Sequence, residues 1–154
     1  MNVVAFSDVF ESSVIVEIHS DLSIPVTSLP GLIILKLFAW LDRHYERDVQ
    51  DIKRLIETYT DAGNMDRLYE EESEELERVG FDTVLAGAFL LGKDARLITG
   101  ETVRTKLSKL FHEKELSKLV GQLARTMSRS DDRTEESEAM LRNLFRGMGL
   151  PGLL

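Results

Sequence analysis

The sequence predicts an α+β fold, in which a small partial sheet at the N-terminus is followed by a bundle of about six helices. Two observations carry this prediction. Aliphatic residues, many of them β-branched, fill two short runs at 14–18 and 22–26, and the turn sequence His19–Asp21 separates them, as in paired strands. After residue 28, apolar residues recur at helical spacing instead.

Length and composition place these elements in one unit. A chain of 154 residues with 43% hydrophobic residues suits a single domain with its own core. We assign residues 1–27 to the partial sheet and residues 28–154 to a helical region that packs with it as a single compact unit.

The N-terminal segment predicts a sheet that is short of partners. Val3 to Phe6 forms an apolar run typical of a strand, and Ser7 can cap a short helix through Ser12. The runs at 14–18 and 22–26 then add two short strands, with Pro25 suited to an edge or a strand end. Because two or three short strands cannot bury a sheet unaided, we expect this sheet to be incomplete and to associate with another chain.

The helical region divides at its polar breaks. Ser28 is a good N-cap, and Pro30 suits the first turn that follows it. The helical patterns cover residues 30–44, 46–59, 67–77, 84–98, 99–111, 113–127 and 135–146. We expect the fourth to be broken near Gly92 and the third, which carries the acidic run EEESEE, to present a solvated face or loop.

One constellation stands out in the first two long helices. Lys36 interrupts an otherwise apolar helix, and a lysine is rarely buried without a partner. The next helix offers Asp48 and Asp51, which lie three residues apart and therefore share a helix face, and Arg47, four residues before Asp51. We interpret Lys36, Asp48 and Asp51 as a cluster that locks the two helices together, with Arg43 or Arg47 as further partners; a divalent metal held by the two carboxylates is the alternative.

The same residues carry a family resemblance. Lys36, Leu37, Ala39, Arg43, Arg47, Asp48, Asp51 and Ile52 form the pattern K-L-x-A-x-x-x-R-x-x-x-R-D-x-x-D-[LI]. This pattern resembles that of predicted nucleotidyltransferases related to the AbiEii-type toxins of type IV toxin–antitoxin systems. The segments 24–32, 61–71 and 85–94 are also similar to that family, so the resemblance covers about the first two-thirds of the chain.

The resemblance implies a function and a site. It implies transfer of a nucleotidyl group from a nucleoside triphosphate with magnesium, and nucleotide binding by Lys36, Arg47, Asp48 and Asp51. In the family, a Gly-Ser signature and paired Asp-x-Asp carboxylates precede this part, and the sequence matches neither. We therefore expect no catalytic residue and no metal site of its own in this chain. The chain would then be the C-terminal part of such a protein, and its sheet would be the remnant of the nucleotidyltransferase core. Whether the chain acts as an enzyme stays open.

Composition excludes several other classes. The absence of cysteine excludes disulfides and thiolate metal sites, and His19, His44 and His112 show no ligand spacing. A net charge of −8 disfavours non-specific nucleic-acid binding, although a local basic patch could still bind one. The N-terminus lacks the pattern of a secretory signal, and no apolar run is long enough to span a bilayer, so we expect a cytoplasmic protein.

Two further functions remain open at this stage. The chain can be a non-catalytic helical module that binds a partner protein, or the C-terminal half of a split nucleotidyltransferase. The corresponding partners are an N-terminal catalytic half, a cognate antitoxin or a second copy in a homodimer. The acceptor of the transferred group does not follow from the sequence.

Overall fold

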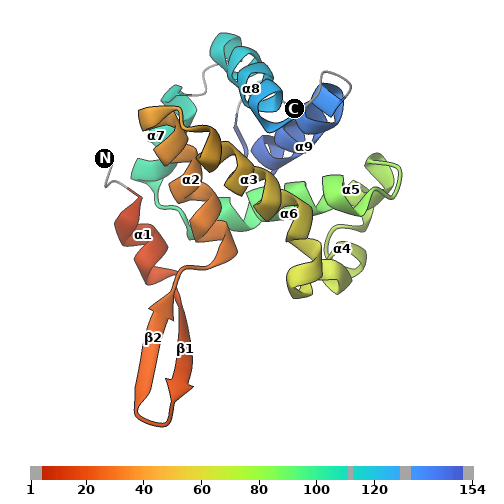
Figure 1. The fold of residues 1–154 in the computed structure, drawn as a ribbon. Coiled ribbons are helices and arrows are strands. Elements are labelled where there is room, and N and C mark those ends of the chain that lie inside the picture. Colours follow the sequence, from red (N-terminus) through yellow and green to blue (C-terminus); the bar gives the residue numbers. More distant parts are fainter. Residues whose placement is uncertain (1–4, 111–112, 129–132, 151–154) are drawn as a thin grey trace.

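The computed structural model describes residues 5–110, 113–128 and 133–150, and these form a helical body with a projecting β-hairpin (Figure 1). The N-terminal elements are α1 (Phe6–Glu11), β1 (Val14–His19) and β2 (Leu22–Val26). The helical body contains α2 (Leu29–Arg43), α3 (Glu46–Thr58), a single π-helical turn η1 (Thr60–Asn64), α4 (Met65–Glu70), α5 (Ser73–Arg78), α6 (Thr83–Ile98), α7 (Glu101–Leu110), α8 (Glu113–Met127) and α9 (Thr134–Gly147).

The α+β prediction is confirmed, with three differences in detail. Phe6 begins helix α1 rather than ending a strand, so that part of the first strand prediction is wrong; Val3 and Val4 lie outside the described residues. The acidic stretch 67–77 forms two short helices, α4 and α5, which raises the helix number above six. The predicted break near Gly92 is wrong because α6 runs unbroken from Thr83 to Ile98.

Local capping sets the ends of α2 and the start of α6. The Ser28 hydroxyl accepts a hydrogen bond from Gly31 N at 3.1 Å and so begins α2, as expected from the sequence. The same helix ends at His44, which adopts a left-handed conformation with φ 53°. Asp82 caps α6 by accepting from the N–H groups of Val84 and Leu85.

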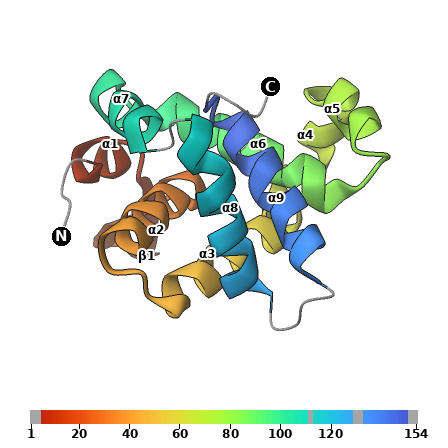
Figure 2. The same ribbon diagram turned by 90° about the horizontal axis from the view of Figure 1, so that it is seen from above.

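Helix α6 is the centre of the body, and α9 packs closely along it (Figure 2). A Cβ built on Gly92 would lie 2.0 Å from the carbonyl oxygen of Leu144 on α9. A Cβ built on Gly147 would lie 2.0 Å from the carbonyl oxygen of Phe89 on α6. The two glycines therefore permit a backbone approach that no other residue allows, which explains why Gly92 does not break its helix.

The core lies around α6 and the inner faces of α2, α3, α8 and α9. Its largest fully buried side chains are Trp40, Phe145, Ile33, Ile34, Leu37, Ile52, Ile56, Leu68, Leu76, Leu90 and Leu91. Within the part of the chain that the structure describes, no helix is long and apolar enough to cross a membrane.

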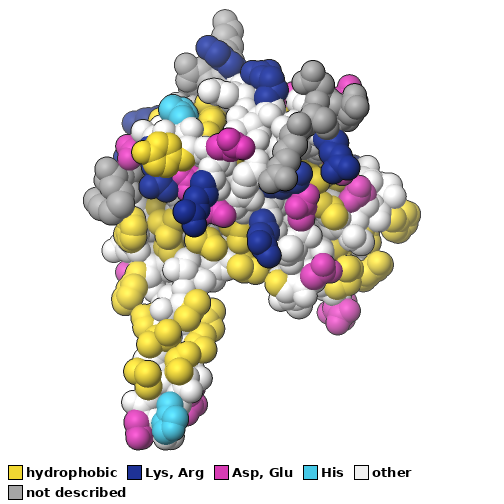
Figure 3. All heavy atoms as spheres, in the orientation of Figure 1, with side chains coloured by type: hydrophobic (Ala, Val, Ile, Leu, Met, Phe, Trp, Pro, Cys, Tyr) yellow, Lys and Arg dark blue, Asp and Glu magenta, His cyan; other side chains and the backbone are white. Residues whose placement is uncertain are grey.

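The hairpin stands apart from this core. β1 and β2 pair antiparallel, with Val14 opposite Val26 and Val16 opposite Ile24. Every residue of both strands is exposed, and hydrophobic side chains cover much of the visible part of the hairpin above a tip that carries acidic and His side chains (Figure 3). The large apolar side chains of the hairpin keep 36–66% of their surface accessible: Val14, Ile15, Val16, Ile18, Leu22, Ile24 and Val26. The sheet among the described residues is thus a small two-stranded hairpin, and it projects from the helical region instead of packing into it.

The α6–α9 contact gives a first prediction. We expect Gly92→Ala or Gly147→Ala to lower the free energy of unfolding by about 3 kcal/mol or more, since the added methyl group must push two backbones apart. Gly121→Ala on α8 is the matched control, because its Cβ would meet only side-chain ends at 3.5 Å or beyond. That variant should gain about 0.5–1 kcal/mol from helix propensity. Urea denaturation measures all three, and equal effects at positions 92 and 121 would contradict the proposed close contact.

Candidate functional site

A charge cluster joins α2 to α3 around the buried carboxylate of Asp48. The side chain of Asp48 is only 2% exposed, whereas those of its partners reach the surface. Arg43 donates from Nε to Asp48 Oδ2 at 2.8 Å and from a terminal nitrogen to Oδ1 at 2.9 Å. Lys36 Nζ donates to Asp48 Oδ1 at 3.2 Å and lies 2.5 Å from Asp51 Oδ2. Two cations and two carboxylates therefore form one network between the helices.

The network stabilises the charged form of its central members. Hydrogen bonding from Arg43, and then from Lys36, holds the pKa of Asp48 below its ordinary value despite the cost of burial. The hydrogen bond to Asp51, assisted by Asp48, raises the pKa of Lys36. Lys36 is therefore a fixed positive charge at neutral pH.

Beside this network lies a hollow of about 320 Å³ along the outer face of α2. Lys36 and Arg43 contribute its cations, and its wall is mostly apolar. The other lining residues are Phe6, Leu32, Leu35, Phe38, Ala39 and Asp42. The lining thus combines an apolar wall with two cations and the Asp42 carboxylate. Such a wall can hold a flat apolar ring system, and the two cations can hold an anionic group that it carries.

The structure brings together three of the four predicted site residues. Lys36, Asp48 and Asp51 meet as expected from their spacing, whereas Arg47 is exposed and makes no contact with the cluster. Of the two arginines that the sequence offered as further partners, Arg43 is the one that pairs with Asp48. Both oxygens of Asp48 accept from cations, and no group of three or more metal-ligating side chains occurs among the described residues. The arrangement thus supports the helix-locking interpretation over a metal site.

A second network, which sequence reasoning did not identify, joins η1 and α4 to α6. Arg67 holds Asp94 with two parallel hydrogen bonds of 2.7 and 3.0 Å. The hydroxyl of Tyr59 donates to the same carboxylate at 2.5 Å, and burial together with this contact raises the pKa of Tyr59. Asn64 accepts from Arg67 and donates to the carbonyl oxygen of Tyr59, closing the network.

The two networks lie in the segments that carried the family resemblance, and a comparison with family profiles tests that resemblance over the whole chain. The profile described as nucleotidyl transferase AbiEii toxin, type IV toxin–antitoxin system, matches residues 3–147. The chain belongs to this AbiEii family. Comparisons with curated proteins and with solved structures gave no match.

Membership in the AbiEii family extends the resemblance beyond the two-thirds expected from the sequence to nearly the whole chain. The segments 61–71 and 85–94, which resemble the family, supply Asn64, Arg67 and Asp94, and these three residues meet in the second network. The signal was present in these segments, but the partners are separated by 27 residues, and no local spacing rule pairs them.

The unequal burial of the two carboxylates gives a second prediction. We expect Asp48→Ala to cost about 2–4 kcal/mol of unfolding free energy, because it leaves Arg43 and Lys36 without their buried partner. Asp51→Ala should cost at most about 1 kcal/mol, since its side chain is 40% exposed and Lys36 keeps Asp48. Thermal unfolding measures both, and a larger loss for Asp51→Ala would contradict this order.

The stability that Asp48 contributes should decrease as the pH falls. Because the folded-state pKa of Asp48 is depressed, its contribution is complete above the unfolded-state pKa of about 3.9 and is lost as the pH falls through the folded-state value. The wild-type chain and Asp48→Ala should therefore approach each other in stability below about pH 4.

Proposed function

We propose that this AbiEii-family chain supplies the cationic side of a nucleotide-binding site for nucleotidyl transfer. The observation that carries the proposal is the placement of Lys36 and Arg43 together on an apolar hollow of about 320 Å³. A nucleoside triphosphate has the matching chemistry, with a flat base for the apolar wall and phosphates for the cations.

The two cations keep donors for a ligand. Lys36 has three N–H donors, and Asp48 and Asp51 engage two of them. Arg43 uses Nε and one terminal nitrogen on Asp48, and its side chain remains 47% exposed. The carboxylates therefore fix the two cations in place without exhausting them.

Asp48 and Asp51 do not fit the magnesium ion that the family resemblance implies. Both are already paired with cations, and a metal would have to displace those partners. The proposal assigns them to positioning Lys36 and Arg43, and it assigns metal binding to the Asp-x-Asp carboxylates of the family, which the sequence does not contain. On this proposal the chain binds a nucleotide but needs a segment with those carboxylates to react.

A third prediction tests this division of roles. We expect the purified chain to bind ATP or another nucleoside triphosphate, and Lys36→Met to weaken that binding about tenfold, the loss of one charge-assisted hydrogen bond. The control is Lys53→Met on α3, whose lysine pairs with Glu57 outside the hollow and whose removal should leave the affinity unchanged. Calorimetric titration measures both variants after thermal unfolding has shown that they fold.

The same preparation tests the catalytic half of the proposal. Labelled nucleoside triphosphate, magnesium, and RNA or protein acceptors should give no transfer with the chain alone. Robust labelling that disappears on mutation of a residue of this chain would contradict the proposal, as would nucleotide binding that Lys36→Met leaves intact.

We also propose that the hairpin accepts a strand from the polypeptide segment that carries the Gly-Ser and Asp-x-Asp residues. Opposite residues in an antiparallel pair alternate between exchanging two backbone hydrogen bonds and exchanging none. Pro25 lies opposite Ile15 and has no N–H, so these two residues form a non-hydrogen-bonded pair. The backbone groups of such a pair point away from the partner strand, toward the outer edges of the hairpin. The outer edge of β2 thus lacks a donor at Pro25, whereas that of β1 offers the N–H and C=O of Ile15 and Glu17.

The side chains favour the same occupant. Alternation along the strands places Val14, Val16, Leu22, Ile24 and Val26 on one face, and all five are exposed; Ile18 lies at the register shift between Glu17 and His19. A face of this kind requires protein cover, and a nucleotidyltransferase sheet that extends from β1 would provide a neighbouring strand and a continuing apolar layer.

A fourth prediction concerns this surface. We expect the chain to form a one-to-one complex with an AbiEii-type segment that contains the Gly-Ser and Asp-x-Asp motifs, as measured by light scattering. Ile24→Lys on the apolar face should abolish the complex, whereas Ser23→Lys on the opposite face should preserve it. A homodimer that the added segment does not displace would favour a second copy as the occupant, and a monomer under both conditions would contradict the proposed surface.

A further inference from the structure

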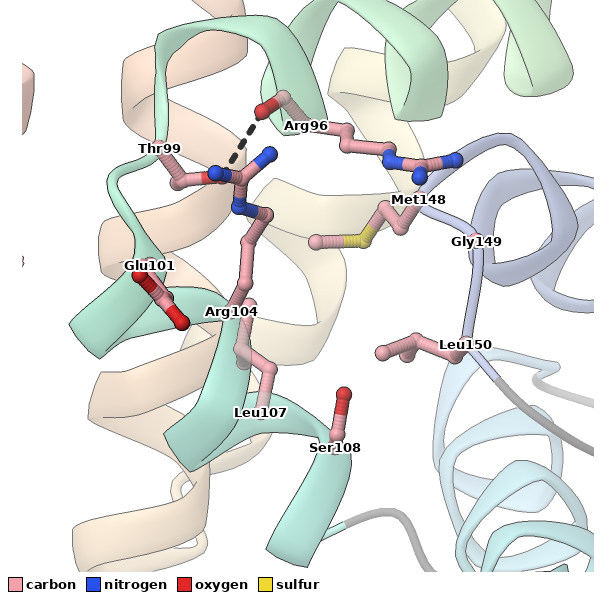
Figure 4. A pocket seen from close by; sticks show the side chains of 9 residues that line it. All are labelled: Arg96, Thr99, Glu101, Arg104, Leu107, Ser108, Met148, Gly149 and Leu150. Carbon is pink, nitrogen blue, oxygen red and sulfur yellow. Dashed lines mark hydrogen bonds between the residues drawn. The ribbon is translucent and has the colours of Figure 1, made fainter.

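A second pocket lies on another part of the molecule, where the C-terminal end of α6, helix α7 and the turn at 148–150 meet (Figure 4). Its volume is about 350 Å³, within the range of small-molecule sites. Leu107, Met148 and Leu150 form a buried apolar wall, with 2%, 6% and 3% of their surfaces exposed. Ser108 adds a hydroxyl group between Leu107 and Leu150 (Figure 4).

Two arginines from different helices give this pocket its charge. Arg96 extends from α6 and Arg104 from α7, and both line the cavity. Neither guanidinium pairs with a carboxylate in the described part of the chain, whereas Arg67 and Arg78 are held by Asp94 and Glu75. Two cations that line one pocket repel each other, so an anion bound between them would be stabilised by both.

The backbone fixes where one of these cations lies. Gly149 has φ +69°, and a Cβ at this position would come within 2.6 Å of a terminal nitrogen of Arg96. The guanidinium therefore lies against the turn that follows α9. At the other side, Thr99 donates to the carbonyl oxygen of Arg96 at 2.9 Å and holds the end of α6 beside Arg104.

Glu101 restricts the kind of anion that fits. Its carboxylate also lines the pocket and would repel a bare phosphate ion. The same carboxylate can accept hydrogen bonds from hydroxyl groups, which sugars provide. A ligand with a phosphate at one end and hydroxyls beside it satisfies both the arginines and Glu101.

We propose that the pocket formed by Arg96, Arg104, Ser108 and Glu101 binds a sugar phosphate monoester such as ribose 5-phosphate. The arginines bind the phosphate with charge-assisted hydrogen bonds, Glu101 accepts from the sugar hydroxyls, and the apolar wall packs against the remainder of the ligand. This site is separate from Lys36 and does not depend on the function proposed for it.

The test uses the full chain with three probes: ribose 5-phosphate, inorganic phosphate and ribose. In calorimetric or NMR titrations we expect ribose 5-phosphate to bind more tightly than inorganic phosphate, and ribose not to bind. Arg96→Gln and Arg104→Gln should each weaken the binding of ribose 5-phosphate about tenfold or more, which corresponds to about 1.4 kcal/mol. Arg54→Gln, which removes an exposed arginine of α3, is the matched control and should have no effect.

Two further variants make the assignment specific. Glu101→Ala should strengthen the binding of inorganic phosphate and reduce the preference for ribose 5-phosphate, because it removes both the repulsion and the hydroxyl acceptor. Lys36→Met should leave this binding unchanged, which separates it from the site on α2. The proposal would be overturned if ribose 5-phosphate did not bind at about 10 mM, which corresponds to less than about 3 kcal/mol of binding free energy. Binding that neither arginine variant weakens would overturn it as well. Equal affinities for the two phosphates would overturn the role of Glu101.

Discussion

The burial of Asp48 is the constraint on which the candidate nucleotide site depends. A carboxylate with 2% of its side chain exposed is tolerated only if cations and hydrogen bonds replace the water it has lost. Arg43 from the end of α2 and Lys36 from its middle meet this requirement from one side of α3. The requirement thereby fixes the spacing of α2 and α3 and places two positive charges along the hollow on α2.

The parts of the fold that the sequence predicted are those that local pattern determines. The hairpin followed from alternating residues at 14–18 and 22–26 around a turn, and the start of α2 followed from Ser28 and Pro30. The predicted break at Gly92 was wrong because a glycine inside a helix pattern suggests a break, whereas here it allows a neighbouring helix to approach closely. That helix is α9, whose Leu144 carbonyl oxygen faces Gly92 from 52 positions away, and no local pattern relates the two residues.

The candidate site shows the same division. Lys36, Asp48 and Asp51 could be predicted because an isolated lysine needs a partner and two aspartates three residues apart share a face. Arg47 lies four residues before Asp51 but is exposed, and Arg43 from the end of α2 pairs with Asp48 instead, a contact between two helices that no spacing along α3 predicts. Arg67 and Asp94 meet only because η1 and α4 turn the chain back onto α6, which is a property of the tertiary fold.

The described surface has two kinds of candidate binding feature, the apolar face of the hairpin and two pairs of cations, and each kind would bind a chemically different partner. The apolar face of the hairpin can gain free energy only by removal from water, so its complement is another polypeptide surface. The cations at Lys36 and Arg43, and those at Arg96 and Arg104, gain from charge-assisted hydrogen bonds, so their complement is an anion such as phosphate. In the AbiEii chain, Lys36 and Arg43 already pair with Asp48 and Asp51, but both cations keep N–H donors for a ligand in the hollow. Carboxylates used in this way position cations rather than metals, and this is the basis on which we propose nucleotide binding, rather than catalysis, for the residues of the resemblance.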